Sequence, residues 1–296
     1  MAKKRSRSSA PKKKAEPEVK VIEKEDLKRT TYKHLKVNFW RTRLHGEELG
    51  AFQALKYQAK TRYFGKDFDI EGVVEEDGQK KYIIAYNKDE WKEAPDDKKR
   101  LVCRLFTILE DKPSMGSSKE AREAKGGNFK GGFELSITHS LIQSSEVREP
   151  APVFFVQIPN MTYLTKIVKS YRLTGTRWNF PLLPEKKEDK LQVVTAKGKV
   201  GLGVDYDIFI GKKKIARIDG QRVQKEWEID IYDENYAKDK TFVMLLILFG
   251  CICNFMKSAT KLIEKFYKPM KDTGTTDYKP PKLEMDLFKN PRLMRK

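Results

Sequence analysis

The chain has few of the residues that usually build a catalytic or metal centre. It contains only three cysteines among its 296 residues, and two of them, Cys251 and Cys253, are one residue apart. A disulfide scaffold is therefore excluded, and a reducing compartment is the expected setting. The three histidines, His34, His45 and His139, are too scattered to predict a histidine-based metal or catalytic cluster.

Recognisable catalytic motifs are also lacking. No serine or cysteine stands in a nucleophile elbow with a base nearby. The GKVGLG sequence at 198–203 resembles a phosphate-binding loop, but a strand is expected after it rather than a helix, so a tight bend is the preferred interpretation. Asp205, Asp207, Glu228 and Asp230 alternate along expected strands and are interpreted as solvated charges. The sequence thus predicts no enzyme, no cofactor and no metal.

What the chain has in excess is positive charge. Lys and Arg number 61 against 42 Asp and Glu, a formal charge of +19. Residues 1–14 carry seven basic residues and no acid, and we expect residues 1–30 to be a disordered basic tail. Two clusters in this tail resemble a bipartite nuclear-import signal: Lys3, Lys4 and Arg5, then Lys12, Lys13 and Lys14. The alternative is a solvated tail that contacts nucleic acid or anionic lipid without selectivity.

From about Tyr32 onwards the chain reads mostly as β-strands. A β-hairpin is predicted where two runs, Phe68–Val74 and Lys81–Tyr86, flank a turn that ends in Gly78. The other expected strands are Val37–Trp40, Leu101–Leu109, Phe133–His139, Val153–Ile158, Arg177–Phe180, Leu191–Thr195, Val204–Ile210, Lys214–Ile218 and Glu226–Tyr232. Residues 31–268 are therefore expected to form one mainly β domain.

Three segments depart from the strand pattern. Glu47–Thr61 is loosely compatible with a helix. Residues 111–132 are polar and glycine-rich, which predicts a long loop, or alternatively a boundary between two small domains. Residues 269–296 are basic, and prolines beginning with Pro269 predict an irregular tail.

The most unusual segment is the apolar run Phe242–Met256, which continues with helical periodicity into Ser258–Tyr267. One helix of more than twenty residues is the simplest interpretation. Because its first half is apolar on all sides, it must be enclosed, and the upstream strands favour enclosure by protein. The alternatives are a membrane span, with Lys257 and Lys261 reaching the interface, or an oligomer interface.

The order of these parts is similar to the end of one known superfamily. A strand pair (Tyr206–Ile218), an acidic–apolar strand (Trp227–Tyr232), a polar link (Asp233–Lys240) and an apolar helix (Phe242–Cys253) follow one another. Over residues 204–256 this arrangement resembles the tubby C-terminal-like superfamily, which includes tubby proteins, phospholipid scramblases and LURP-one-related proteins. The resemblance implies a roughly twelve-stranded antiparallel barrel threaded by a hydrophobic helix. It also implies a non-enzymatic module, with phosphoinositide binding and nuclear shuttling as precedents. The extension through Lys257–Lys268 departs from the tubby pattern.

Two groups of basic residues are candidates for binding an anion. One is the tight turn at Lys212, Lys213 and Lys214. The other comprises Lys166, Lys169, Arg172 and Arg177, close in sequence to Tyr171 and Trp178. The alternative is that these residues bind no ligand, because basic turns are expected everywhere in a chain of this charge.

The resulting functional hypothesis is an intracellular binding module that resides in the nucleus, in the cytoplasm or peripherally at membranes. The anionic partner expected in the first place is a phosphoinositide-containing membrane surface. An import receptor is expected to bind the basic tail. One alternative is a nuclear or ribosome-associated nucleic-acid-binding protein. The other is a scramblase-like protein anchored by Phe242–Met256.

Overall fold

The computed structural model describes residues 29–40, 68–108, 129–159, 161, 165–170, 175–183, 190–198, 205–221, 225–282 and 284–285. The predicted import signal, the predicted helix Glu47–Thr61 and most of the predicted loop lie outside these residues, as do Arg172 and residues 286–296. The described residues from Thr31 onwards belong to one compact unit.

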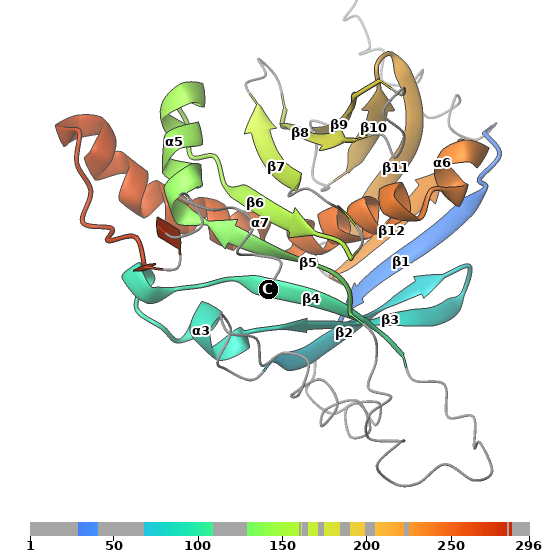
Figure 1. Ribbon diagram of the computed structural model, residues 1–296, viewed down its shortest axis with the longest axis horizontal. Helices are drawn as coiled ribbons and strands as arrows, with labels where there is room; N and C mark the ends of the chain where they lie inside the picture. The colour runs from blue at the N-terminus through green and yellow to red at the C-terminus, as the bar shows by residue number, and fades with distance from the viewer. Residues whose placement is uncertain are drawn as a thin grey trace, which may run out of the picture. The chain divides into compact units, whose positions relative to one another are not determined.

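Twelve antiparallel strands close into a barrel (Figure 1). Each strand pairs with its neighbour in sequence, and β1 pairs with β12 to complete the ring. The strands are β1 (Lys33–Phe39), β2 (Asp69–Glu76), β3 (Gln79–Tyr86), β4 (Val102–Thr107), β5 (Phe129–Ser136), β6 (Val153–Gln157), β7 (Thr165–Ser170), β8 (Arg177–Leu182), β9 (Gln192–Gly198), β10 (Tyr206–Ile210), β11 (Lys213–Gln221) and β12 (Glu226–Ile231).

Alternation of side chains decides which residues face the inside of the barrel. In β12, Trp227, Ile229 and Ile231 are buried while the acids between them are partly exposed. The predicted hairpin forms between β2 and β3, with Asp77 and Gly78 both at positive φ in the turn, as the right-handed twist of the strands requires.

The apolar run becomes the first half of α7 (Lys240–Thr273), which lies in the barrel core (Figure 1). All residues from Phe242 to Cys253 are buried. Asp239 begins the helix by accepting hydrogen bonds from the backbone N–H groups of Thr241 and Phe242 at 2.9 and 3.0 Å. Among the described residues, α7 is the one helix long and apolar enough to cross a membrane. However, 78% of its most apolar window is buried inside the protein.

This architecture confirms the predicted fold class, a mainly β antiparallel barrel that encloses a hydrophobic helix. It also shows that no domain boundary separates β4 from β5, because the two strands pair directly from Val102–Glu134 to Phe106–Phe129. Four short or peripheral helical segments complete the described part: α3 (Lys88–Lys92), a 3-10 turn η1 (Asp96–Lys98), α5 (Ile137–Val147) and α6 (Glu234–Lys238). Of these, α5 and α6 pack against α7.

The prediction that Phe133–His139 is a strand is wrong at its end, because Ser136 caps α5 and His139 lies in its first turn. This helix has no apolar stripe that would reveal it. It is instead fixed by serine hydroxyls, since Ser140 and Ser144 accept hydrogen bonds from the backbone N–H groups of Val153 and Ala151. Strand β7 was also not predicted, because its six residues contain two lysines and a serine.

Two predicted irregular segments are more regular than their composition indicates. The glycines of the predicted loop 111–132 belong in part to β5, where a Cβ on Gly132 would lie 2.8 Å from the Cys103 carbonyl oxygen. Glycine there serves close packing rather than a loop. Helix α7 continues past Pro269 for one more turn and ends at Gly274, in the left-handed region with φ 75°. The prediction that Pro269 breaks the helix is therefore wrong.

Candidate functional site

The predicted lysine cluster lies at the turn between β10 and β11. The three lysine side chains do not share a partner. Lys213 donates to Asp233 at 2.5 Å, and Lys214 pairs with Asp207 at 2.9 Å. Lys212 is exposed and makes no hydrogen bond or ion pair with a described residue. The turn thus leaves one of its three lysines without a carboxylate partner in the described part of the chain.

The second predicted group is spread over β7 and the start of β8. Lys166 is exposed and lies 5.6 Å from the Phe155 ring centroid, a cation–π contact. Lys169 pairs with Glu149 at 3.1 Å. Arg177 lies opposite Lys197 across the β8–β9 pair, and its buried Nε has no hydrogen-bond partner among the residues that the structure describes.

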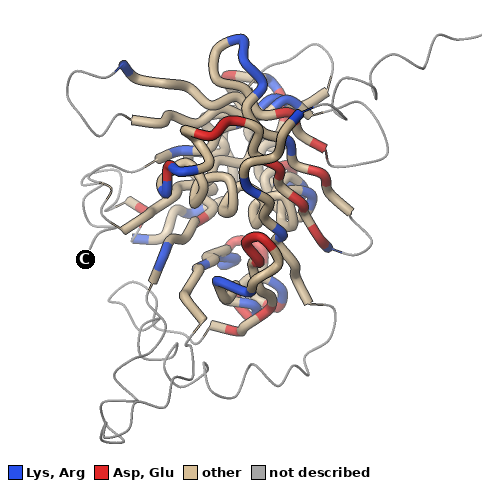
Figure 2. Tube along the Cα trace, turned by 90° about the vertical axis from the view of Figure 1, so that its right-hand side faces the viewer, with Lys and Arg blue, Asp and Glu red and all other residues tan. Residues whose placement is uncertain are grey.

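Basic and acidic residues are interleaved along the strands (Figure 2). Two of the acids expected to be solvated have side-chain partners, since Asp207 forms an ion pair with Lys214 and the Asp230 carboxylate lies 2.8 Å from His34 Nδ1. Among the described residues, no group of three or more His, Cys, Asp or Glu side chains is placed to hold a metal ion.

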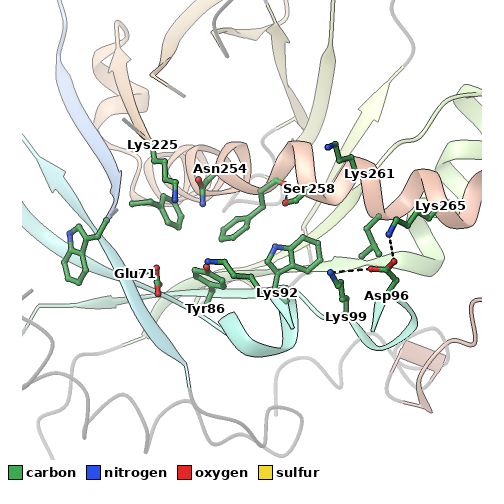
Figure 3. A pocket seen from close by; sticks show the side chains of 15 residues that line it. Glu71, Tyr86, Lys92, Asp96, Lys99, Lys225, Asn254, Ser258, Lys261 and Lys265 are labelled. Carbon is green, nitrogen blue, oxygen red and sulfur yellow. Dashed lines mark hydrogen bonds and ion pairs between the residues drawn. The ribbon is translucent and has the colours of Figure 1, made fainter. Parts of the chain in front are cut away.

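A cavity of about 490 Å³ opens where α7 leaves the barrel. We call it the exit cavity. The ends of β1 and β3, the start of β2, helix α3, the turn η1 and the residue after it, the residue before β12 and the middle of α7 all contribute to it. Figure 3 shows α7 on one side and the segment from Glu71 to Lys99 on the other.

Aromatic side chains line much of the exit cavity. Phe255 of α7 packs edge-on against Phe39 at 5.5 Å and against Tyr86 at 5.0 Å between ring centroids. Trp91, buried on α3, and Trp40, directly after β1, complete the aromatic lining. All of these rings except that of Trp40 are buried, so each presents only a small part of its apolar surface to the cavity.

The polar lining of the exit cavity is dominated by lysines. They are Lys92, Lys99, Lys225, Lys261 and Lys265. The two lining carboxylates are already paired: Glu71 accepts from the buried Lys88, and Asp96 lies 2.5 Å from Lys265 and 3.4 Å from Lys99. The Lys265 ammonium is the main cause that lowers the pKa of Asp96. Lys225 and Lys261 have no ion pair with any residue that the structure describes.

Sequence reasoning missed this site because its lysines come from distant segments that only barrel closure brings together. One signal was present in α7. Asn254, Ser258, Lys261 and Lys265 recur at spacings of four, three and four residues, so they share one helix face. A polar stripe on a helix that otherwise enters a core indicates a surface facing solvent or a ligand.

A second polar cluster joins α5 to the chain that follows α7. Glu284 accepts hydrogen bonds from the Ser136 hydroxyl at 2.5 Å, the Thr138 backbone N–H at 2.9 Å and the Tyr278 hydroxyl at 2.5 Å. His139 Nδ1 lies 3.0 Å from the Ser136 oxygen. Because the Ser136 hydroxyl donates its hydrogen bond to Glu284 rather than to His139, this is not the geometry of a serine nucleophile activated by histidine. The cluster fastens the C-terminal segment to the N-terminus of α5.

Comparison with known proteins finds no matching protein-family model, and no significant match to a curated protein or to a solved structure. The twelve-stranded barrel around a helix is consistent with the tubby-like resemblance. Membership of that superfamily stays a prediction.

Proposed function

We propose that this protein is a non-enzymatic binding module that recognises an anionic partner, a phosphoinositide-bearing membrane surface in the first place. The observation that carries the proposal is the imbalance of charge in the exit cavity, where five lysines line the wall beside two carboxylates. Glu71 is paired with Lys88, which is not a lining residue, and Asp96 is paired with Lys99 and Lys265. Lysine ammonium groups act as point charges for phosphate.

The dimensions of the site support a headgroup as the ligand. A cavity of about 490 Å³ falls within the range that holds a small molecule. The lysines would contact phosphates, while the aromatic lining would contact the apolar face of a sugar-like ring or the start of an acyl chain. The basic residues of the N-terminal tail would add a nonselective tether, at about 1 kcal/mol for each residue near an anionic surface.

The tubby-like resemblance adds phosphoinositide binding and nuclear shuttling as precedents. The import signal at Lys3–Arg5 and Lys12–Lys14 belongs to the same proposal, as does binding at Lys212–Lys214. A nucleic-acid partner shares the basic tail, but the aromatic cavity is closed on one side by α7 and suits a compact headgroup better than a continuous strand.

The test is co-sedimentation with phosphatidylcholine vesicles that contain either phosphoinositide or phosphatidylserine, at graded salt. A variant with Lys225→Ala and Lys261→Ala should lose about thirty-fold in affinity for phosphoinositide vesicles, from roughly 1 kcal/mol for each lysine. The matched control, Lys257→Ala with Lys271→Ala, removes the same charge from exposed positions of α7 outside the cavity.

Equal losses in the two variants would show that bulk charge rather than the exit cavity binds the vesicle. The Lys212–Lys214→Ala variant tests the turn in the same assay. Tighter binding to RNA, falling steeply with the logarithm of salt concentration, would instead favour the nucleic-acid alternative.

A further inference from the structure

Two lysines from separate elements converge on one carboxylate at the edge of the exit cavity (Figure 3). Asp96 begins the 3-10 turn η1, Lys99 follows that turn, and Lys265 comes from α7. The Asp96 carboxylate lies 2.5 Å from Lys265 Nζ and 3.4 Å from Lys99 Nζ. No other carboxylate that lines the cavity lies between two of its lysines, because Glu71 is bound by Lys88.

This contact is poorly suited to a purely structural role. The Lys265 side chain is 63% exposed and that of Asp96 36%. An exposed ion pair of this kind contributes little to stability, because water and salt screen it and two long side chains must be ordered. The segment from α3 to η1 has other anchors, since Trp91 is buried and Asn87 accepts a hydrogen bond from the Val102 backbone N–H at 2.8 Å.

The arrangement of charges matches what a bound phosphate would need. Two ammonium groups point at one anionic centre, beside an aromatic surface. A phosphate carries more charge than a carboxylate and offers three acceptor oxygens, so it competes well for the same two donors.

We propose that the Asp96 carboxylate occupies the place of the ligand's phosphate and is displaced from Lys99 and Lys265 when the anion binds. Asp96 is then a built-in competitor that sets the affinity of the exit cavity. This inference rests on the proposed function, since it assumes that the cavity takes a phosphate-bearing group. It predicts that removing the Asp96 charge strengthens binding, whereas loss of a structural ion pair would leave binding unchanged or weaken it.

The experiment compares Asp96→Asn with Asp97→Asn in the full chain. Asp97 is the next residue of η1 and is exposed, so its replacement changes the net charge equally without touching the two lysines. The probes are soluble inositol trisphosphate, measured by calorimetry, and the phosphoinositide vesicles described above. We expect Asp96→Asn to bind about three- to fivefold tighter than the wild type, and Asp97→Asn to stay within about twofold.

Two further variants guard against indirect effects. Asp96→Glu keeps the competing charge and should bind as the wild type does. In a Lys99→Met, Lys265→Met background, Asp96→Asn should no longer tighten binding, because the carboxylate has no lysines left to occupy. Thermal unfolding of each variant checks that the barrel is intact.

The outcomes separate the two proposals. If the wild type binds and Asp96→Asn is no tighter than Asp97→Asn, the competitor role of Asp96 is overturned while the binding function stands. If none of the proteins binds either probe, the proposed function falls and the role of Asp96 falls with it. If only Asp96→Asn binds, both proposals gain support.

Discussion

His139 is a titratable residue whose surroundings oppose its charged form. Burial in the first turn of α5 and the nearby Lys166 ammonium lower the pKa of His139 from 6.5 to about 4, against the weaker opposite effect of Glu284. Its ring also packs edge-on against Phe155, with 4.7 Å between centroids. The folded protein therefore holds this imidazole neutral under conditions in which an unfolded chain would protonate it.

The His139 shift predicts a loss of stability in acid. Between pH 6.5 and about 4 the unfolded chain binds a proton at this residue and the folded chain does not, so folding stability falls as pH falls through this window. His139→Gln should remove roughly 2–3 kcal/mol of that loss, less than the full shift corresponds to because the ring is only half-buried and solvent screens its charge. Urea unfolding of both proteins at several pH values measures it. If the free energy of unfolding changed with pH in the same way for the wild type and for His139→Gln, His139 would not be the cause of the loss.

At the scale of elements, α7 and the strands that face it are held by interlocking rings. Phe249 of α7 is fully buried and lies 5.8 Å from Phe180 on β8 and 5.2 Å from Tyr206 on β10, between ring centroids. The second half of the helix is covered differently, since Phe266 packs against Tyr278 of the following segment.

This difference predicts unequal costs for the same truncation. Phe249→Ala leaves a cavity between the helix and a closed wall that cannot collapse, and should reduce the free energy of unfolding by about 3–5 kcal/mol. Phe266→Ala should cost less, because the segment around Tyr278 can move inwards. Chemical denaturation of the two variants compares them directly, and an equal loss would argue against a rigid enclosure of the first half of α7.

Whether an element could be predicted from the sequence depends on whether its signal lies in neighbouring residues. Strands such as β12 and the β2–β3 hairpin carry a period-two pattern or a turn signal, so they were predictable. Helix α5 was not, because its serines accept hydrogen bonds from the backbone of Ala151 and of Val153 at the start of β6, which no local pattern shows. The exit cavity depends on Lys92, Lys225 and Lys265 meeting after closure, which sequence neighbours cannot reveal.

At the scale of the whole molecule, ring closure decides where the apolar helix can reside. The β1–β12 pair completes a continuous wall, with Lys33 opposite Ile231 and Asn38 opposite Glu226. The apolar half of α7 fills the space inside this wall and is not available to lipid while the barrel stays closed.

Cell fractionation tests that enclosure. We expect a tagged form of the protein to leave the membrane fraction on washing with high salt or carbonate, because only its charged surface would contact lipid. Retention until detergent is added would place Phe242–Met256 in the bilayer and would favour the scramblase-like alternative.

The position of α7 along the chain also bears on how the protein is made. All twelve strands precede it, so the ribosome synthesises the strands of the barrel before the helix that occupies its core. Until Phe242 and the residues after it emerge, the inward side chains of the nascent strands have no partner, and such exposed surfaces invite aggregation. The final fold must therefore form late in translation or after it. A nascent chain that stalls before α7 is expected to need a chaperone to prevent aggregation.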